Sequence, residues 1–302
     1  MKPTLRQLQY LVAIAETGRF GDAAKKVHVS QPSLSAQIAD MEAQLGTQLV
    51  ERGRAGSILT PAGEDVLHRA RVVLKDMDDL KAAAQQYSGE MAGRVRLGVL
   101  PSIGPYLLPM AAKRLHAQFP ALKLSVREES RQALFEKIND GRFDLILTVG
   151  GEQEGLVTRS ILTENLYTCL APDAELAQTS GPIKASELKG ATLLTLGQDF
   201  VLSRTVRDLA AVTGAHISDE YEGNSLDALR QMAAMGTGIA VVPSLYAASE
   251  TRNDDGVVVR RIDASDMQRE VQLAWRVTTP LDNVFSAMAD ILSEEAHKLI
   301  QD

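Results

Sequence analysis

Four uncharged hydrogen-bonding side chains alternate just after Ser30, namely Gln31, Ser33, Ser35 and Gln37. Glutamine amides and serine hydroxyls can pair with base edges in the major groove of DNA, and the amides of a helix N-terminus favour a phosphate. We therefore expect a helix whose first turns face DNA, with Ser30 and Pro32 at its beginning.

The neighbouring segments supply the elements that such a helix needs. Thr4 and Gln7 have the spacing of a capping box, and the helix that they open is predicted to end at Gly18. Phe20 to Val27 is a second, shorter helix, and Ser30 caps a third that ends at Gly46. Two helices across a tight turn form a helix-turn-helix over Phe20 to Ala39. The alternative is a plain helical hairpin whose polar face meets water.

Two extended pieces around a glycine-rich basic turn follow, over Leu49 to Leu59. This pattern predicts a wing, in which Arg52 and Arg54 are candidates for contacts to phosphates or to the minor groove.

A long helix is predicted to begin at Thr60 and Pro61 and to run to about Ser88. Its apolar residues recur at alternating spacings of 4 and 3, which is a heptad stripe: Val66, Ala70, Val73, Met77, Leu80, Ala84 and Tyr87. We expect this stripe to join two copies of the chain. The alternative is a helix that packs along its own chain.

Charge and composition restrict the function classes. The chain has a net charge of −7. Residues 1 to 60 contain seven Lys and Arg and five Asp and Glu, a balance of +2, which leaves −9 for the remaining residues. A mildly basic head on an acidic body permits phosphate contact at one end. One cysteine and five scattered histidines indicate neither a disulfide within the chain nor a metal site, and no cofactor motif is found. No membrane span or signal peptide is predicted, so we expect a cytoplasmic protein.

From Arg94 onward, strand-like runs alternate with amphipathic helices, which predicts α/β architecture with mostly parallel sheets. The expected strands are Val95 to Leu100, Leu122 to Arg127, Asp144 to Thr148, Leu166 to Ala171, Thr192 to Leu196, Gly238 to Val242 and Val271 to Trp275. The expected helices are Tyr106 to His116, Gln132 to Asn139, Arg204 to Thr213, Leu226 to Met235 and Phe285 to Ile300.

The head closely resembles the LysR-type transcriptional regulators, in the segments Phe20-Gly21-Asp22-Ala23-Ala24, Val29 to Ser35 and Leu59-Thr60-Pro61-Ala62-Gly63. The segments Pro101 to Pro109 and Ser225 to Arg230 are similar to the OxyR-like, peroxide-sensing branch of that family. The resemblance implies a winged helix-turn-helix that binds double-stranded DNA, a linker helix that forms a homodimer, and a homotetramer. It also implies a two-lobed, Rossmann-like effector domain resembling type 2 periplasmic binding proteins.

On this basis we expect a DNA-binding domain over residues 1–60, a linker over 61–90 and an effector domain over 91–302. Lobe I would take about 91–163 and 267–302, and lobe II about 164–266. Small-molecule effectors bind at strand ends and helix starts in such folds. The predicted cleft residues are Pro101, Ser102, Ile103, Thr148, Val149, Phe200, Val201, Leu202, Asn224 and Ser225. For Ser102 and Ser225, a plain helix-capping role is the alternative.

The chain departs from the peroxide-sensing branch at its two redox cysteines, whose matching positions here are Val201 and Ala210. A disulfide switch of that type is therefore excluded, and the resemblance leaves a small-molecule effector as the signal. A redox role for Cys169 is one alternative, although its apolar run indicates a buried strand residue. The other is a solute-binding or enzymatic α/β protein whose helical head only mediates oligomerisation. No catalytic motif is found, so we expect no enzymatic activity.

Overall fold

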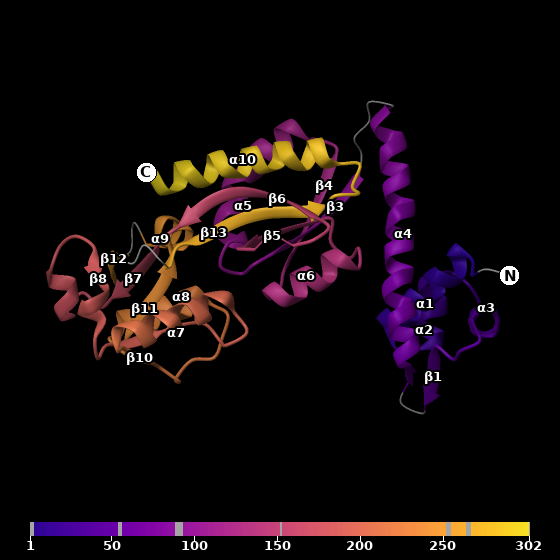
Figure 1. Cartoon of the computed structure of the whole chain (residues 1–302), viewed down its shortest axis with the longest axis horizontal. Helices are drawn as coiled ribbons and strands as arrows, with labels where there is room; N and C mark the ends of the chain where they lie inside the picture. The colour runs from indigo at the N-terminus through magenta and orange to yellow at the C-terminus, as the bar shows by residue number, and fades with distance from the viewer. Residues whose placement is uncertain are drawn as a thin grey trace. The chain divides into compact units, whose positions relative to one another are not determined.

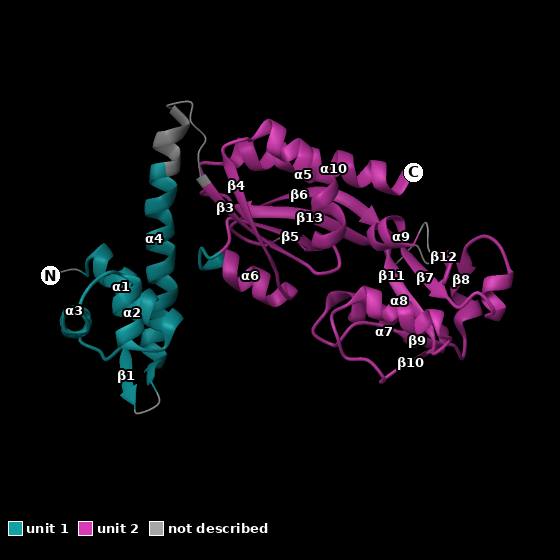
Figure 2. Ribbon diagram, turned by 180° about the vertical axis from the view of Figure 1, so that it is seen from behind, with its two compact units in different colours: residues 1–90, 139–142 teal, residues 91–138, 143–302 magenta. Residues whose placement is uncertain are grey.

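The structure is a computed structural model that describes residues 3–53, 56–87, 93–151, 153–251, 255–263 and 267–301. It contains two compact units: Met1–Glu90 with Asn139–Arg142, and Met91–Ile138 with Phe143–Asp302 (Figure 2). Each unit is described by itself.

The first unit begins with three helices and a two-stranded wing, followed by a long helix. Their bounds are α1 (Leu5–Thr17), α2 (Phe20–Lys26), α3 (Gln31–Leu45), β1 (Val50–Gly53), β2 (Gly56–Leu59) and α4 (Pro61–Tyr87). The predicted capping box opens α1, since the Thr4 hydroxyl accepts from the Gln7 amide at 3.3 Å and the Gln7 side chain accepts from the Thr4 amide at 2.8 Å. Gly18 ends α1 with φ 68°, a conformation that costs glycine no steric strain.

The core of this unit comes from the inward faces of the three short helices, the first wing strand and Leu67 of α4. Leu34, Ile38 and Met41 of α3 are fully buried against it. One side chain fixes the entry to the wing, because a Glu42 carboxylate oxygen accepts from the amides of Leu49 at 2.8 Å and Val50 at 3.0 Å. The position of the wing therefore depends directly on α3.

The long helix α4 packs against the head at its start and is exposed further along. Ala70 is 2% exposed and α4 contacts α1, whereas Val73 and Leu80 of the heptad stripe are 42% and 62% exposed. The Ala84 and Tyr87 side chains lie outside the described residues. Contact of α4 with α1 thus accounts for the apolar residues in the first turns of the stripe. The later apolar residues stay available to a second copy of the chain.

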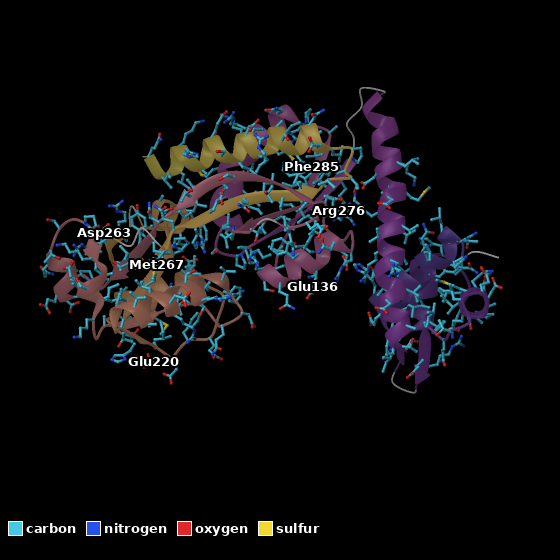
Figure 3. All side chains as sticks on the ribbon, in the orientation of Figure 1. Glu136, Glu220, Asp263, Met267, Arg276 and Phe285 are labelled. Atoms are coloured by element: carbon cyan, nitrogen blue, oxygen red, sulfur yellow. The ribbon has the colours of Figure 1, made fainter. Side chains whose placement is uncertain are left out.

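The second unit contains a five-stranded sheet in the order β4-β3-β5-β13-β6 (Figure 1). The strands are β3 (Gly93–Val99), β4 (Leu122–Glu128), β5 (Leu145–Val149), β6 (Leu156–Glu164) and β13 (Arg269–Arg276). The helices packed with it are α5 (Gly104–Gln118), α6 (Arg131–Asn139) and α10 (Asp282–Gln301). Figure 3 labels Phe285 of α10, whose ring lies 5.9 Å from that of the fully buried Trp275.

A six-stranded sheet in the order β10-β9-β11-β7-β12-β8 forms the rest of this unit. Its strands are β7 (Leu166–Leu170), β8 (Ile183–Lys184), β9 (Thr192–Leu194), β10 (His216–Ile217), β11 (Ile239–Pro243) and β12 (Val258–Asp263). Its helices are α7 (Val201–Thr213), α8 (Leu226–Ala234) and α9 (Ser244–Glu250), with short 3₁₀ helices at Glu175–Gln178 and Ala185–Leu188.

Both sheets are mixed, which corrects the expectation of mostly parallel sheets. In the first sheet β3 is parallel to β4 and β5, but β13 is antiparallel to β5 and β6. The physical reason is that the chain leaves the first sheet after β6, forms the second sheet with β7 to β12, and returns with β13, which therefore runs antiparallel to β6 and β5. The sequence analysis missed the strands β6, β8, β10 and β12 and the helix α9. The domain and lobe boundaries stay predictions.

Candidate DNA interface and effector site

The predicted DNA-reading side chains lie on the first turns of α3. Ser30 caps this helix, because its hydroxyl accepts from the Ser33 amide at 3.3 Å. Gln31, Pro32, Ser33 and Gln37 are exposed, and Ser35 is half-buried. The apolar residues of the same helix face the core, so one polar face is left for an external partner.

The wing arginines have different outcomes. Arg54 lies outside the described residues. The Arg52 guanidinium donates from Nη2 to the Ser35 hydroxyl at 2.8 Å and lies 4.3 Å from the centroid of the Phe20 ring. In this structure Arg52 therefore contacts the helix-turn-helix itself, which the sequence analysis did not foresee.

Several predicted effector residues meet at one edge of the five-stranded sheet. Because β3 and β5 are parallel, their carboxyl ends bring Ser102 and Thr148 to the same edge. The antiparallel strand β13 begins there with Arg269, and β6 ends there with Glu164, the residue opposite Arg269. All four side chains are at least nine-tenths buried.

Arg269 and Glu164 form a buried ion pair that the sequence analysis missed. Arg269 Nη2 donates to Glu164 Oε2 at 2.5 Å, and its Nη1 donates to the Ser102 hydroxyl at 3.4 Å. The other carboxylate oxygen of Glu164 accepts from the Leu245 amide, in the first turn of α9, at 3.0 Å. The network thus connects the end of β3 to a helix that follows a strand of the second sheet. Charged residues at the ends of otherwise apolar strands were the available signal.

Three buried polar atoms at this edge have no hydrogen-bond partner among the described residues: Thr148 Oγ1, Gln272 Oε1 and Arg269 Nε. Thr148 and Gln272 face each other across the β5–β13 pair. Because an unpaired buried polar atom costs about 1 to 3 kcal/mol, such a group is a candidate for contact with a ligand.

The remaining predicted cleft residues are distributed unevenly. Ile103, Val149 and Leu202 belong to the hydrophobic core, so their side chains are buried in the protein interior. Pro101, Phe200 and Val201 are half-buried, and Asn224 is exposed. The Ser225 hydroxyl accepts from the Ala228 amide at 3.2 Å, so in this structure Ser225 caps α8.

The single cysteine is a buried residue of the second sheet. Cys169 of β7 faces Ala240 of β11 on one side and Val259 of β12 on the other, and it is 0% exposed. Burial raises the pKa of its thiol to about 12, so the reactive thiolate is scarce near neutral pH. Val201 and Ala210, at the positions that match the redox cysteines of the OxyR-like branch, both lie on α7.

Among the described residues, no cluster of three or more His, Cys, Asp or Glu side chains could hold a metal ion. In the same ranges, no helix is both long and apolar enough to cross a membrane.

A winged helix-turn-helix, a long partly exposed helix and a two-sheet α/β unit define the class of DNA-binding regulators with a sensing domain. The family profile "Bacterial regulatory helix-turn-helix protein, lysR family" matches residues 5–64, and the profile "LysR substrate binding domain" matches residues 88–297. The chain belongs to the LysR family and is a DNA-binding transcriptional regulator.

Individual relatives agree over nearly the whole chain. It is 33% identical over 291 residues to the hydrogen peroxide-inducible genes activator of Dickeya chrysanthemi, covering 96% of this chain and 95% of that protein. It is 31% identical to the transcriptional regulator EstR of Acinetobacter baylyi, covering 96% of each chain. Full-length OxyR C199D from Pseudomonas aeruginosa has a similar structure, with a TM-score of 0.80, 29% identity and coverage of 96% and 94%.

A structure of full-length CbnR with its target DNA shares the fold, with a TM-score of 0.67, 22% identity and coverage of 98% and 99%. The two family profiles and the sequence relatives confirm the predicted family and DNA-binding function, and the similar structures confirm the predicted fold class.

Proposed function

We propose that this regulator reads promoter DNA through α3 and the wing, and that a small polar effector, most simply a carboxylate, changes this binding from the edge formed by Ser102, Thr148, Arg269 and Gln272. The observation that carries the effector proposal is the buried, incompletely paired polar edge around a buried arginine. A carboxylate accepts hydrogen bonds from arginine and from hydroxyls, so it suits Arg269, Ser102 and Thr148, whereas the unpaired Oε1 of Gln272 requires a donor group on the same molecule.

The proposed signal passes through the Arg269–Glu164 pair to α9. Next to Leu245, the Tyr246 hydroxyl donates to Asp227 at 2.9 Å and accepts from Arg230 at 3.1 Å, which ties α9 to α8. Burial raises the pKa of Tyr246, so the phenol keeps the proton that it donates. The Tyr246 ring packs edge-on against Tyr106 of α5, with 5.1 Å between the ring centroids, so α9 contacts helices of both predicted lobes. An effector that competes for Arg269 would disturb this connection, and it shifts the regulator only if it binds one arrangement better.

We further propose that α4 joins two copies of the chain, that two such dimers form a tetramer, and that the protein acts in the cytoplasm by binding alone, without catalysis. The exposure of Val73 and Leu80 supports the first step. An exposed apolar stripe at heptad spacing is stabilised by pairing with a second helix.

The DNA-binding proposal is tested by gel-shift titration of the full-length protein against the DNA upstream of its own gene and against a random duplex, at several salt concentrations. Preference for the upstream DNA, with affinity that falls as salt rises, is the expected result. Footprints that do not change with any bound effector would refute the coupling between effector and DNA.

We expect Gln31→Ala and Ser33→Ala to relax sequence preference. Each good base contact is worth about 1 to 3 kcal/mol, so affinity for the preferred DNA should fall by about 5- to 150-fold while random DNA is bound much as before. Gln44→Ala is the matched control, because Gln44 lies on the last turn of the same helix and donates to Asp40. Equal losses on both duplexes would contradict the assignment of Gln31 and Ser33 to base edges.

We expect Thr148→Val to weaken effector binding without loss of stability, because it removes an unpaired buried hydroxyl from a side chain of nearly the same shape. The measurement is a thermal-shift titration with a panel of mono- and dicarboxylates, in which a specific ligand raises the melting temperature with the logarithm of its concentration. Thr168→Val is the control, since that buried hydroxyl already donates to the Arg260 carbonyl. If no carboxylate stabilises the wild type, the proposed ligand class is wrong.

A further inference from the structure

One side chain of the wing contacts both helices of the helix-turn-helix. Arg52 of β1 donates to the Ser35 hydroxyl of α3 at 2.8 Å and places its guanidinium 4.3 Å from the ring centroid of Phe20, the first residue of α2. A planar guanidinium can stack on an aromatic ring while its edge donates a hydrogen bond, and a lysine cannot reproduce both contacts.

The residue opposite Arg52 in the wing supplies a second attachment. Ser57 is its cross-strand partner, and the Ser57 amide donates to the Gly18 carbonyl, at the end of α1, at 2.8 Å. At this cross-strand pair the wing therefore has two attachments. Its backbone bonds the turn between α1 and α2, and its Arg52 side chain contacts α2 and α3.

The charge of Arg52 is not engaged by a carboxylate in the part of the chain that the structure describes. Its two contacts are a neutral hydroxyl and an aromatic face, so they fix the position of the guanidinium without neutralising it.

We propose that Arg52 is a positioning residue for DNA reading, which holds the wing at a fixed distance from the recognition helix α3 so that both enter their grooves in register. The inference rests on the proposed reading of base edges by α3. In the specific complex both the wing and α3 must fit their grooves, so ordering them before binding lowers the entropy cost of forming that complex. Nonspecific complexes are looser and gain less from this ordering.

The test compares Arg52→Lys with the wild type, full length, on the DNA upstream of its own gene and on a random duplex, over a salt series. Lysine keeps the positive charge but loses the stacked, forked geometry. We expect about a tenfold loss on the upstream DNA, little change on random DNA and an unchanged salt slope. Glu51→Gln is the control, because Glu51 is the exposed neighbour on the other face of the same strand.

Two outcomes would overturn the proposal: full affinity in Arg52→Lys, or an equal loss on both duplexes. A pure phosphate contact gives the first outcome, and in Arg52→Ala it also flattens the salt slope by about one. Amide hydrogen exchange at Ser57 supplies a second measurement that does not require DNA binding. Faster exchange there in Arg52→Lys, with α1 unchanged, supports the proposal, and unchanged exchange opposes it. A wild type that does not discriminate between the duplexes would instead refute the DNA-reading function.

Discussion

Glu164→Gln is expected to destabilise the effector domain by about 3 to 5 kcal/mol, which is the usual effect of removing one partner of a buried ion pair. The glutamine has nearly the same volume and can still accept from the Leu245 amide, so the loss isolates the charge that Arg269 requires. Trp275 provides the measurement, because it is the only tryptophan of the chain and is fully buried on β13, the strand of Arg269. In urea, the midpoint of its fluorescence transition should fall by about 1 M or more.

Two comparisons make this result specific. Asp290→Asn breaks the exposed pair with Arg159 in the same lobe and should cost less than about 1 kcal/mol. Replacing both buried partners, with Glu164→Met and Arg269→Met together, should recover most of the lost stability. This double variant should fold yet fail to respond to the effector, because the arginine that is proposed to bind the effector is gone. A Glu164→Gln midpoint equal to that of Asp290→Asn would show that the buried pair is dispensable.

Gly63→Ala is expected to disrupt the junction between the head and the linker helix. A Cβ atom at this position would lie 2.1 Å from the Leu49 carbonyl oxygen, which also accepts from the Thr60 amide. The Gly63 amide donates to the Thr60 hydroxyl at 2.9 Å, so the first turn of α4 cannot move away without losing this bond. Overpacking usually lowers the free energy of unfolding by about 1 to 3 kcal/mol, and we expect a loss at or above the upper end of this range. We also expect the affinity for DNA to fall more than tenfold.

The measurement for Gly63→Ala is hydrogen exchange of the α1 to α3 peptides in the full-length protein, together with the gel-shift titration. Gly53→Ala is the matched control, because among the described residues the same methyl group added in the wing would meet the Gly56 carbonyl oxygen alone, at an ordinary contact distance of 3.6 Å. Wild-type protection in Gly63→Ala would contradict the expected clash.

Local features of the head were predictable because their causes lie within a few residues. The capping box of Thr4 and Gln7, the Ser30 cap and the Thr60–Pro61 start are interactions across three or four positions, and the structure places α1, α3 and α4 where these signals predict. The side of α3 that faces outward follows in the same way from the helical repeat of its apolar residues. The absence of the redox cysteine pair is likewise a property of the sequence alone.

The partners of Arg52 and Arg269 were decided only by the tertiary structure. Arg52 bonds a residue 17 positions away and Arg269 one that is 105 positions away, and an arginine carries no local signal of which distant group it will meet. β6 and β12 escaped prediction because polar residues on them, such as Arg159 and Arg260, bond partners on other segments, and β8 and β10 because two residues carry no pattern. The sequence by itself therefore determined the helix-turn-helix and the polar face of α3. The contacts that hold the wing, and the buried polar edge around Arg269, depend on which segments the fold brings together.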